Sequence, residues 1–335
     1  MERRRFQQKN RRQTSGKLSA EAFYSTYHGH ELQHLELLQN RMRLERDAIW
    51  LAGDSSLDNK HWFPEDEAPV VNHMDRVLKE PNSCRRDVAW WINQLVEEKG
   101  YGDILFAINT SYEEGKIESR ARGQLLPQDE YLRDNVRAND SVIVSVGGND
   151  IALFPQLPCT IINMALLNFC TPQICLDNAC GCALPCDDYV WGCSTGCLSN
   201  FCAFPFGYGY MLHLFGTRME NYIDRLTSKQ RPKMIGVCAI YFPDEEPGDS
   251  WAELPLSKLG YDSNPGKLQG LIQKIYVDAI SRIQVQGTKV VPIALYRALD
   301  GKTTDDYEAR VEPSATGGRK MAELFMDTMF HKKMM

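Results

Sequence analysis

Short apolar stretches alternate with helical patterns along most of this chain, and that alternation restricts the fold more than any other feature of the sequence. Each stretch is rich in Val, Ile, Leu and Ala and ends in small or polar residues, as buried parallel strands do at their carboxyl ends. We expect five strands, at 48–54, 104–109, 142–146, 234–240 and 289–295. Because helices separate the strands, the sequence predicts an α/β fold with three layers, α/β/α, around a five-stranded parallel sheet.

Apolar residues between the strands recur at spacings of three and four, which is typical of helices with one buried face. We expect helices at 31–48, 85–99, 128–137 and 266–284. In a sheet of this kind, functional residues gather beyond the carboxyl ends of the strands. The residues directly after the strands are therefore the first candidates for a site.

The composition favours one folded domain after a polar tail. Hydrophobic residues make up 43% and charged residues 24% of the 335 residues, as in ordinary globular proteins. We expect a single domain over 21–335 and a disordered basic tail over 1–20, with a weak tether to an anionic membrane surface as the alternative interpretation of the tail. The net charge of -6 provides no basic field for a phosphate backbone, so nucleic acid is not an expected partner.

An unusual insert, residues 151–217, separates the third and fourth expected strands. It holds nine of the 11 cysteines, many aromatic residues and no Lys or Arg. We expect a compact subdomain or lid, whose aromatic residues form an acyl pocket, a membrane-facing surface or a satellite core. The odd number of cysteines and the lack of a signal peptide pattern favour free thiols and a cytoplasmic location.

The tripeptide Gly53-Asp54-Ser55 directly follows the first expected strand. A serine there stands at a strand-to-helix turn, where its hydroxyl is exposed at the functional edge of the sheet. Gly53 would permit a tight turn, and Asp54 would accept backbone hydrogen bonds that hold the loop. This arrangement predicts that Ser55 is a nucleophile.

A second motif, Gly147-Gly148-Asn149-Asp150, follows the third expected strand. It directs the Asn149 amide toward the same edge of the sheet as the serine. An amide that faces the developing oxyanion of an acyl-transfer reaction typically contributes about 10²–10³ in rate. Asn149 is therefore our candidate oxyanion donor, with Gly147 in a supporting role.

Together, the segments 50–58 and 144–150 resemble two sequence blocks of the GDSL or SGNH hydrolases, a superfamily of esterases, lipases and related acyltransferases. The resemblance covers the chain from residue 48 to the C-terminus. It implies that Ser55 is the nucleophile, that its backbone amide and Asn149 stabilise the oxyanion, and that the substrate is a small-molecule or lipid ester. No nucleotide-binding pattern is present, so we expect no cofactor.

The chain departs from the family pattern in two places. After the second strand, Asn109-Thr110-Ser111 stands where the family has a glycine, so the donor from that block is unassigned. In the final block, Glu312 occupies the position of the catalytic histidine and Ala309 that of its acidic partner.

The general base is consequently open among three groups. Glu312 and Asp306 are carboxylate candidates, and His61 is the histidine nearest to the serine in sequence. A carboxylate of ordinary pKa near 4 is poorly matched to a serine proton unless burial raises that pKa. A catalytically weak or inactive protein that binds a lipid or other ligand is the alternative function.

One further pattern, His30-Glu31-Leu-Gln-His34, matches the His-Glu-x-x-His arrangement of zinc proteases. A helix would place both histidines on one face, with Glu31 as the base. A zinc metalloprotease is therefore a further alternative function. However, the pattern lies before the first strand and no third ligand is identifiable, so our main expectation is that the protein has no metal site.

Overall fold

The computed structural model describes residues 16–80, 83–152, 158–190 and 193–330. A five-stranded sheet forms its centre, in the order β2-β1-β3-β8-β9, and all neighbouring strands are parallel. The strands are β1 (Asp47–Gly53), β2 (Leu105–Asn109), β3 (Ser141–Ser145), β8 (Met234–Ala239) and β9 (Lys289–Ala294). Each boundary lies within one residue of its expected position. The predicted fold class is confirmed.

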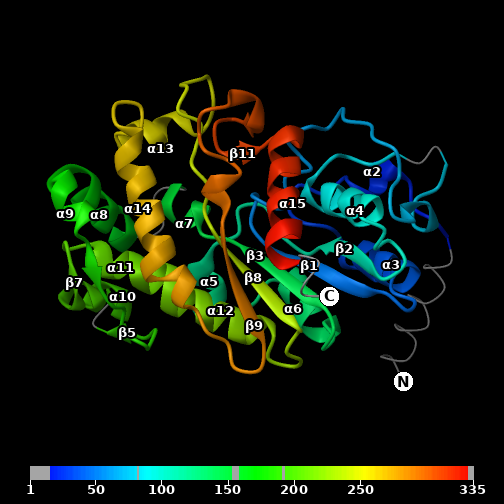
Figure 1. Cartoon of the computed structure of the whole chain (residues 1–335), viewed down its shortest axis with the longest axis horizontal. Coiled ribbons are helices and arrows are strands. Elements are labelled where there is room, and N and C mark those ends of the chain that lie inside the picture. Colours follow the sequence, from blue (N-terminus) through cyan, green and yellow to red (C-terminus); the bar gives the residue numbers. More distant parts are fainter. Residues whose placement is uncertain (1–15, 81–82, 153–157, 191–192, 331–335) are drawn as a thin grey trace.

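Helices cover both faces of the sheet (Figure 1). Alternate side chains of β1 point to opposite faces, so that Ile49 and Leu51 belong to one apolar core and Trp50 to the other. The first core is closed by α4 (Val88–Glu98) and α15 (Ala315–Met329). The second is closed by α3 (Leu32–Met42), α5 (Ile117–Arg122), α6 (Pro127–Asn135), α12 (Met219–Leu226) and α14 (Pro265–Asp278).

All four expected helices are shorter than predicted, and the first and the last differ most. The first ends at Met42, because Leu44 takes a positive φ of 21° and turns the chain into β1. The last ends at Asp278, and a 3₁₀ turn follows at Ile280–Arg282. The other short elements are α2 (Ala20–Phe23), α13 (Glu253–Lys258), β10 (Tyr307–Glu308), β11 (Glu312–Pro313) and the 3₁₀ turns Met74–Arg76, Leu295–Arg297 and Thr304–Asp306.

The insert lies at one end of the molecule, beyond α14 (Figure 1). Its buried residues, such as Leu167 and Tyr210, belong to the same core as α12 and α14, so it has no separate core. Among the described residues ten cysteines are free thiols, and eight of these lie in the insert. Its elements are α7 (Gly148–Ala152), α8 (Pro158–Ala165), a π-helical turn (Leu166–Cys170), α9 (Gln173–Asp177), β4 (Cys180–Gly181), β5 (Tyr189–Val190), β6 (Cys193–Ser194), α10 (Thr195–Leu198), a 3₁₀ turn (Ser199–Cys202), β7 (Ala203–Phe204), α11 (Tyr208–Leu212) and a π-helical turn (His213–Arg218).

Most of the expected tail, residues 1–15, lies outside the described residues. Leu18 already forms a backbone bridge with Leu78, so the described fold begins before residue 20. Within the described ranges, no helix is long and apolar enough to span a lipid bilayer.

A buried carboxylate aligns the amino ends of β1 and β3. Asp140 accepts hydrogen bonds from the Arg43 guanidinium at 2.7 Å, from the Ala48 amide at 2.9 Å and from the Trp50 indole at 2.9 Å. Arg43 and Asp140 are both almost fully buried. The pair therefore joins α3, β1 and β3 at one point.

We expect Asp140→Ala to lower the free energy of unfolding by about 3–5 kcal/mol, because it leaves a buried guanidinium without its partner. Chemical denaturation measures this change. The control is Asp134→Ala, which removes an exposed ion pair with Lys229 and should cost less than about 1 kcal/mol. Equal losses in the two variants would contradict this role of Asp140.

Candidate active site

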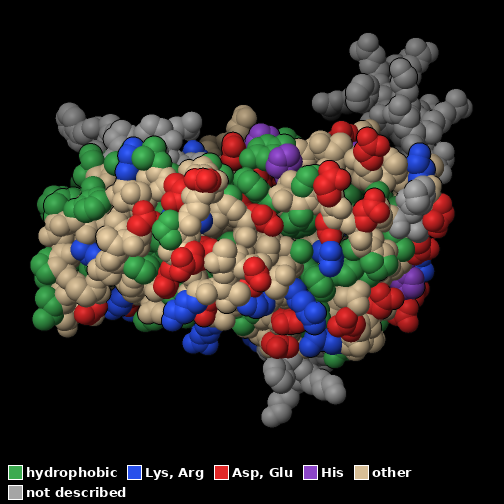
Figure 2. Space-filling view, turned by 90° about the horizontal axis from the view of Figure 1, so that it is seen from above, with side chains coloured by type: hydrophobic (Ala, Val, Ile, Leu, Met, Phe, Trp, Pro, Cys, Tyr) green, Lys and Arg blue, Asp and Glu red, His purple; other side chains and the backbone are tan. Residues whose placement is uncertain are grey.

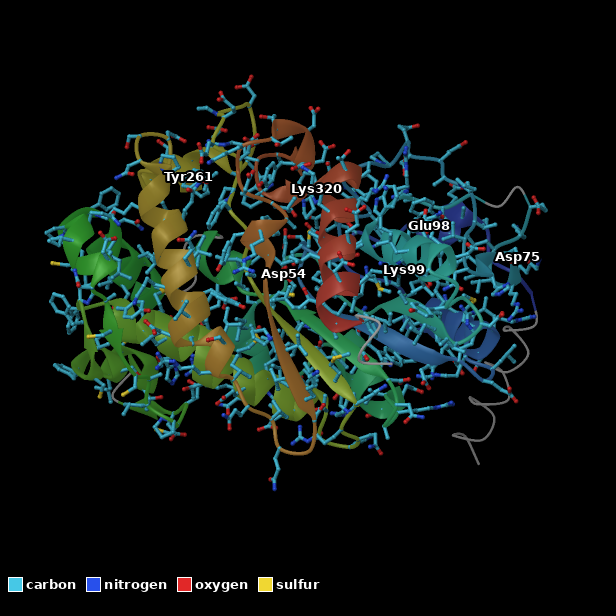
Figure 3. All side chains as sticks on the ribbon, viewed as in Figure 1. Asp54, Asp75, Glu98, Lys99, Tyr261 and Lys320 are labelled. Atoms are coloured by element: carbon cyan, nitrogen blue, oxygen red, sulfur yellow. The ribbon has the colours of Figure 1, made fainter. Side chains whose placement is uncertain are left out.

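The Asp54 carboxylate joins the two motif turns at the carboxyl end of the sheet. One oxygen accepts the Ser56 amide at 3.1 Å, and the other accepts the Gly147 amide at 3.0 Å. The Asp54 amide in turn donates to the Ser145 carbonyl at 3.0 Å. The expectation that Asp54 holds the loop through backbone hydrogen bonds is confirmed. Figure 3 shows its central position, between α14 and α15.

Two glycines allow this close approach of the turns. A Cβ on Gly53 would lie 1.9 Å from the Ser145 carbonyl oxygen. Glycine is therefore required by the contact with β3, whereas we had expected it to be required by a tight turn. Gly147 has a φ of 125°, and a Cβ there would lie 2.6 Å from the Phe215 ring. Both positions therefore exclude larger residues.

Asn149 and Asp150 are fixed by the loop that follows β2. The Asp150 carboxylate accepts the Ile117 amide at 2.8 Å and the Glu118 amide at 3.1 Å at the start of α5. The Asn149 side-chain nitrogen donates to the Gly115 carbonyl at 3.2 Å. A primary amide carries two N–H groups, so this bond fixes the side chain and leaves a second donor for a ligand.

The backbone amide of Ser55 is the second candidate oxyanion donor. Within the described residues it donates to no protein acceptor. The amides after β2 differ, because Thr110 donates to the Leu51 carbonyl at 2.9 Å and Ser111 to the Asn109 side chain at 3.0 Å. These two amides are already used, and the donor of that block stays unassigned.

Glu312 lies in the same pocket as Ser55 and Asn149. It is 3% exposed and belongs to β11, which pairs with β10 in a hairpin. Burial raises the pKa of Glu312 to about 8; a hydrogen bond from Ser55 lowers this pKa, and the negative charges of Asp54 and Asp58 raise it. Burial thus raises the pKa of this carboxylate far enough for it to accept a proton from a serine hydroxyl.

Three side chains hold the hairpin that carries Glu312. The Tyr241 hydroxyl donates to the Val311 carbonyl at 2.5 Å, and the Asn59 amide donates to the Pro313 carbonyl at 2.9 Å. Arg310 anchors the hairpin turn to Glu253 and Asp262. The residues on both sides of Glu312 are therefore fixed from the protein interior.

The Arg310 guanidinium is 5% exposed and reaches toward α13. It donates to Glu253 at 2.8 Å, to Asp262 at 3.0 Å and to the Asp244 carbonyl at 3.1 Å. Ala309 and Arg310 both have positive φ, 49° and 68°, so these contacts also hold a turn that non-glycine residues rarely adopt. The hairpin and α13 are thereby tied together.

Sequence reasoning missed a second buried carboxyl group, Glu113. Burial raises its pKa to about 9, and the negative charge of Glu312 is the second cause. Its amide donates to Asp58 at 3.1 Å, and Asp58 forms a fully buried ion pair with Lys60. Glu113 follows β2, so its place just beyond a strand end was the signal that could have found it.

Asp306 and His61 lie elsewhere. Asp306 accepts a hydrogen bond from Lys320 of α15 at 2.6 Å and does not line the pocket of Ser55, so its candidacy as base was wrong. Lys320 is labelled on α15 in Figure 3. The His61 ring packs edge-on against Tyr27, with ring centroids 4.6 Å apart, and also lies outside the pocket.

The histidines of the zinc pattern do not share a helix face. His30 lies before α3, stacks on Phe23 with ring centroids 4.4 Å apart and makes a 3.0 Å hydrogen bond to the Phe23 carbonyl. The helix begins at Leu32, so only His34 is helical. In the described part of the chain, no group of three potential metal ligands exists. The geometry of a zinc protease is therefore not formed.

The pocket above Ser55 encloses about 710 Å³ of empty space, part of it open to solvent. Its wall is mainly apolar and comes from the segment after β8 and from α13 and α14, whereas the insert contributes Ile151 alone among the described residues. The interpretation of the insert aromatics as an acyl pocket was wrong. The apolar wall consists of Ile240, Tyr241, Pro243, Trp251, Leu256, Leu259, Leu268, Ile272 and Val311.

Comparison with known proteins finds similar solved structures only. No family model matches the chain, and no curated protein matches it. An extracellular lipase from Streptomyces rimosus is 9% identical, with a TM-score of 0.38 over 84% of this chain and 100% of that one. A putative GDSL-like lipase from Parabacteroides merdae is 13% identical, with a TM-score of 0.39 over 86% and 98%.

An acetylxylan esterase from Geobacillus stearothermophilus is 9% identical, with a TM-score of 0.39 over 85% of this chain and 95% of that one. Identities and scores at this level are low. The interpretation of the site therefore depends on the residues of this chain and on their geometry.

The contact between β1 and β3 yields a stability prediction. We expect Gly53→Ala to lower the free energy of unfolding by about 3 kcal/mol or more, because the new methyl group collides with a backbone carbonyl of the neighbouring strand. The matched control is Gly148→Ala, where a Cβ meets nothing within 4 Å and the change should stay within about 1 kcal/mol. Thermal unfolding of both variants would test this, and an undisturbed Gly53→Ala protein would contradict it.

Proposed function

We propose that this chain is a serine hydrolase that cleaves ester or related acyl bonds through an acyl-enzyme at Ser55. The observation that carries the proposal is the meeting of Ser55, Asn149 and Glu312 in one largely apolar pocket. The resemblance of the two motif segments to the GDSL or SGNH hydrolases supports the same chemistry.

In the proposed reaction, the Ser55 hydroxyl attacks the carbonyl carbon of the substrate while Glu312 accepts the hydroxyl proton. The negative charge that develops on the carbonyl oxygen is stabilised by the Ser55 amide and by the free N–H of Asn149. Glu312 then returns the proton to the leaving alcohol, and a water molecule releases the acyl group by the same steps in reverse order.

Glu312 replaces a histidine in this scheme because its environment changes its basicity. A carboxylate with an ordinary pKa is a weak base toward a serine hydroxyl, whereas one with a pKa of about 8 has a basicity close to that of an imidazole. Burial and the negative charge of Glu312 also raise the pKa of Glu113. The two carboxyl groups therefore oppose each other's ionisation, and a single negative charge shared between them is favoured over two.

The apolar wall of the pocket favours an acyl group over a sugar or a charged group. Leu256 of α13, Leu259 directly after it, and Leu268 and Ile272 of α14 line the space above Ser55. Filling this space with hydrocarbon removes apolar surface from water, at about 25 cal/mol per Å². We therefore propose small-molecule or lipid esters as the substrate class.

A ligand-binding protein without turnover is the second candidate. The observation in its favour is the same raised pKa, since Glu312 carries its proton in most molecules at neutral pH and cannot act as a base in that form. Such a protein would use the apolar pocket to hold a lipid or another apolar ligand.

Labelling with a fluorophosphonate separates the two candidates. We expect the wild-type protein to be labelled at Ser55 and Ser55→Ala not to be labelled, whereas Ser228→Ala, which removes an exposed hydroxyl outside the pocket, should react as the wild type does. Asn149→Ala should lower kcat for a soluble ester by about 10²–10³. A folded wild-type protein that is not labelled even at alkaline pH would favour the binding protein.

The pH dependence tests the base. Because Glu312 is active only when deprotonated and its pKa is raised to about 8, we expect kcat/KM to be low at acidic pH and to rise through pH of about 8. Glu312→Gln should abolish this rise, and Glu113→Gln, which imitates the neutral neighbour, should retain it. A rise near pH 6.5, the usual range of histidine, would instead point to an imidazole base.

A further inference from the structure

The insert exposes an unusual amount of apolar surface. Among the described residues, more than half of the exposed large hydrophobic side chains lie in this segment. Phe201 is 80% exposed, Ile174 69% and Phe169 63%. We use the name apolar end for the following six exposed side chains: Ile162, Phe169, Ile174, Phe201, Phe204 and Phe206.

These side chains come from elements that lie at one end of the molecule. Figure 1 places α8, α9 and β7 together there, and Figure 2 shows hydrophobic side chains gathered over that end. The rings of Phe201 and Phe206 are in edge-to-face contact, with centroids 6.0 Å apart. The exposed rings thus form a local surface rather than scattered single contacts.

The apolar end continues toward the mouth of the pocket. Phe169 lies against Gly260, just after α13. On α13 itself, Leu254 is 62% exposed, and the preceding Trp251 is 38% exposed and also lines the pocket above Ser55. The segment around α13 therefore contacts the insert at Gly260 and lines the pocket at Trp251.

The charged residues in and around the insert indicate which kind of lipid surface it could bind. No Lys or Arg occurs between residues 138 and 217, so this surface does not attract anionic headgroups. Asp187 is buried against Arg122 and Arg218. The exposed charged residues of the insert are Asp177 and Asp188, whose negative charge repels anionic headgroups.

One lysine lies nearby: the Lys267 ammonium donates to the Asn168 and Thr171 carbonyls, on either side of Phe169. Exposed aromatic rings with so little positive charge around them suit the interface of a neutral bilayer.

We propose that the apolar end docks on a zwitterionic lipid surface. Contact with lipid would cover the exposed rings and bring lipid close to the segment around α13, which lines the pocket. The docking does not require Ser55. The further statement that the docked protein draws its ester substrate from the lipid rests on the proposed function.

The test uses Ser55→Ala protein, so that no lipid is consumed, and sedimentation with phosphatidylcholine vesicles. We expect the protein to sediment with the vesicles to the same extent at low and high salt. Adding Phe201→Ser, Phe204→Ser and Phe206→Ser should lower the partition coefficient by about 100-fold or more, since each ring removes a large apolar area.

The matched control carries Leu44→Ser and Ile104→Ser, which remove exposed apolar side chains outside the insert. It should bind vesicles as Ser55→Ala alone does. Near-UV circular dichroism of all variants establishes that each is folded. Rings at the surface with few internal contacts should be replaceable without loss of the fold.

Three results would overturn the docking proposal. They are a protein that stays in the supernatant, a phenylalanine variant that sediments unchanged, and binding that requires anionic lipid and disappears with salt. If instead the phenylalanine variant dissociates a dimer, the apolar end is an interface between copies of the chain. Hydrolysis of a water-soluble ester by the wild type, measured separately, tests the proposed function alone.

Discussion

The closeness of β1 and β3 at their carboxyl ends is the constraint on which the rest of the site depends. At Gly53 the two strands approach so nearly that no side chain fits between them, and the Asp54 carboxylate binds the turn of one strand to the turn of the other. The nucleophile candidate and the oxyanion candidate are therefore parts of one rigid unit. Their separation is set by backbone contacts of the sheet rather than by flexible side chains.

The sheet and the first two parts of the site could be predicted because they depend on local sequence. Apolar runs located the five strands within one residue, and the motifs placed Ser55 and Asn149 at neighbouring strand ends. Local sequence could not decide which residue is the best candidate for the general base. Glu312 and Asp306 are both acidic and only six positions apart, and the difference between them is a partner, Lys320, that comes from α15.

The burial of the acidic side chains could not be predicted from the sequence either. Glu113 and Glu312 look like ordinary charged residues in the chain, yet both are almost fully covered when the loops after β2 and β9 meet. The same holds for the pocket wall, which comes mainly from the segment after β8 and from α13 and α14, whereas the described part of the insert contributes only Ile151. A composition pattern identified an apolar segment but not the direction in which its side chains face.

The contacts of Arg310 have a consequence for selectivity. This side chain links the hairpin that carries Glu312 to α13, whose Leu256 forms part of the pocket wall. A ligand that pushes this wall outward also pulls on the hairpin. The fit of the ligand in the pocket and the position of the Glu312 carboxylate are therefore mechanically coupled. Under the proposed chemistry, a badly fitting chain would be rejected through a slower chemical step even when it binds well.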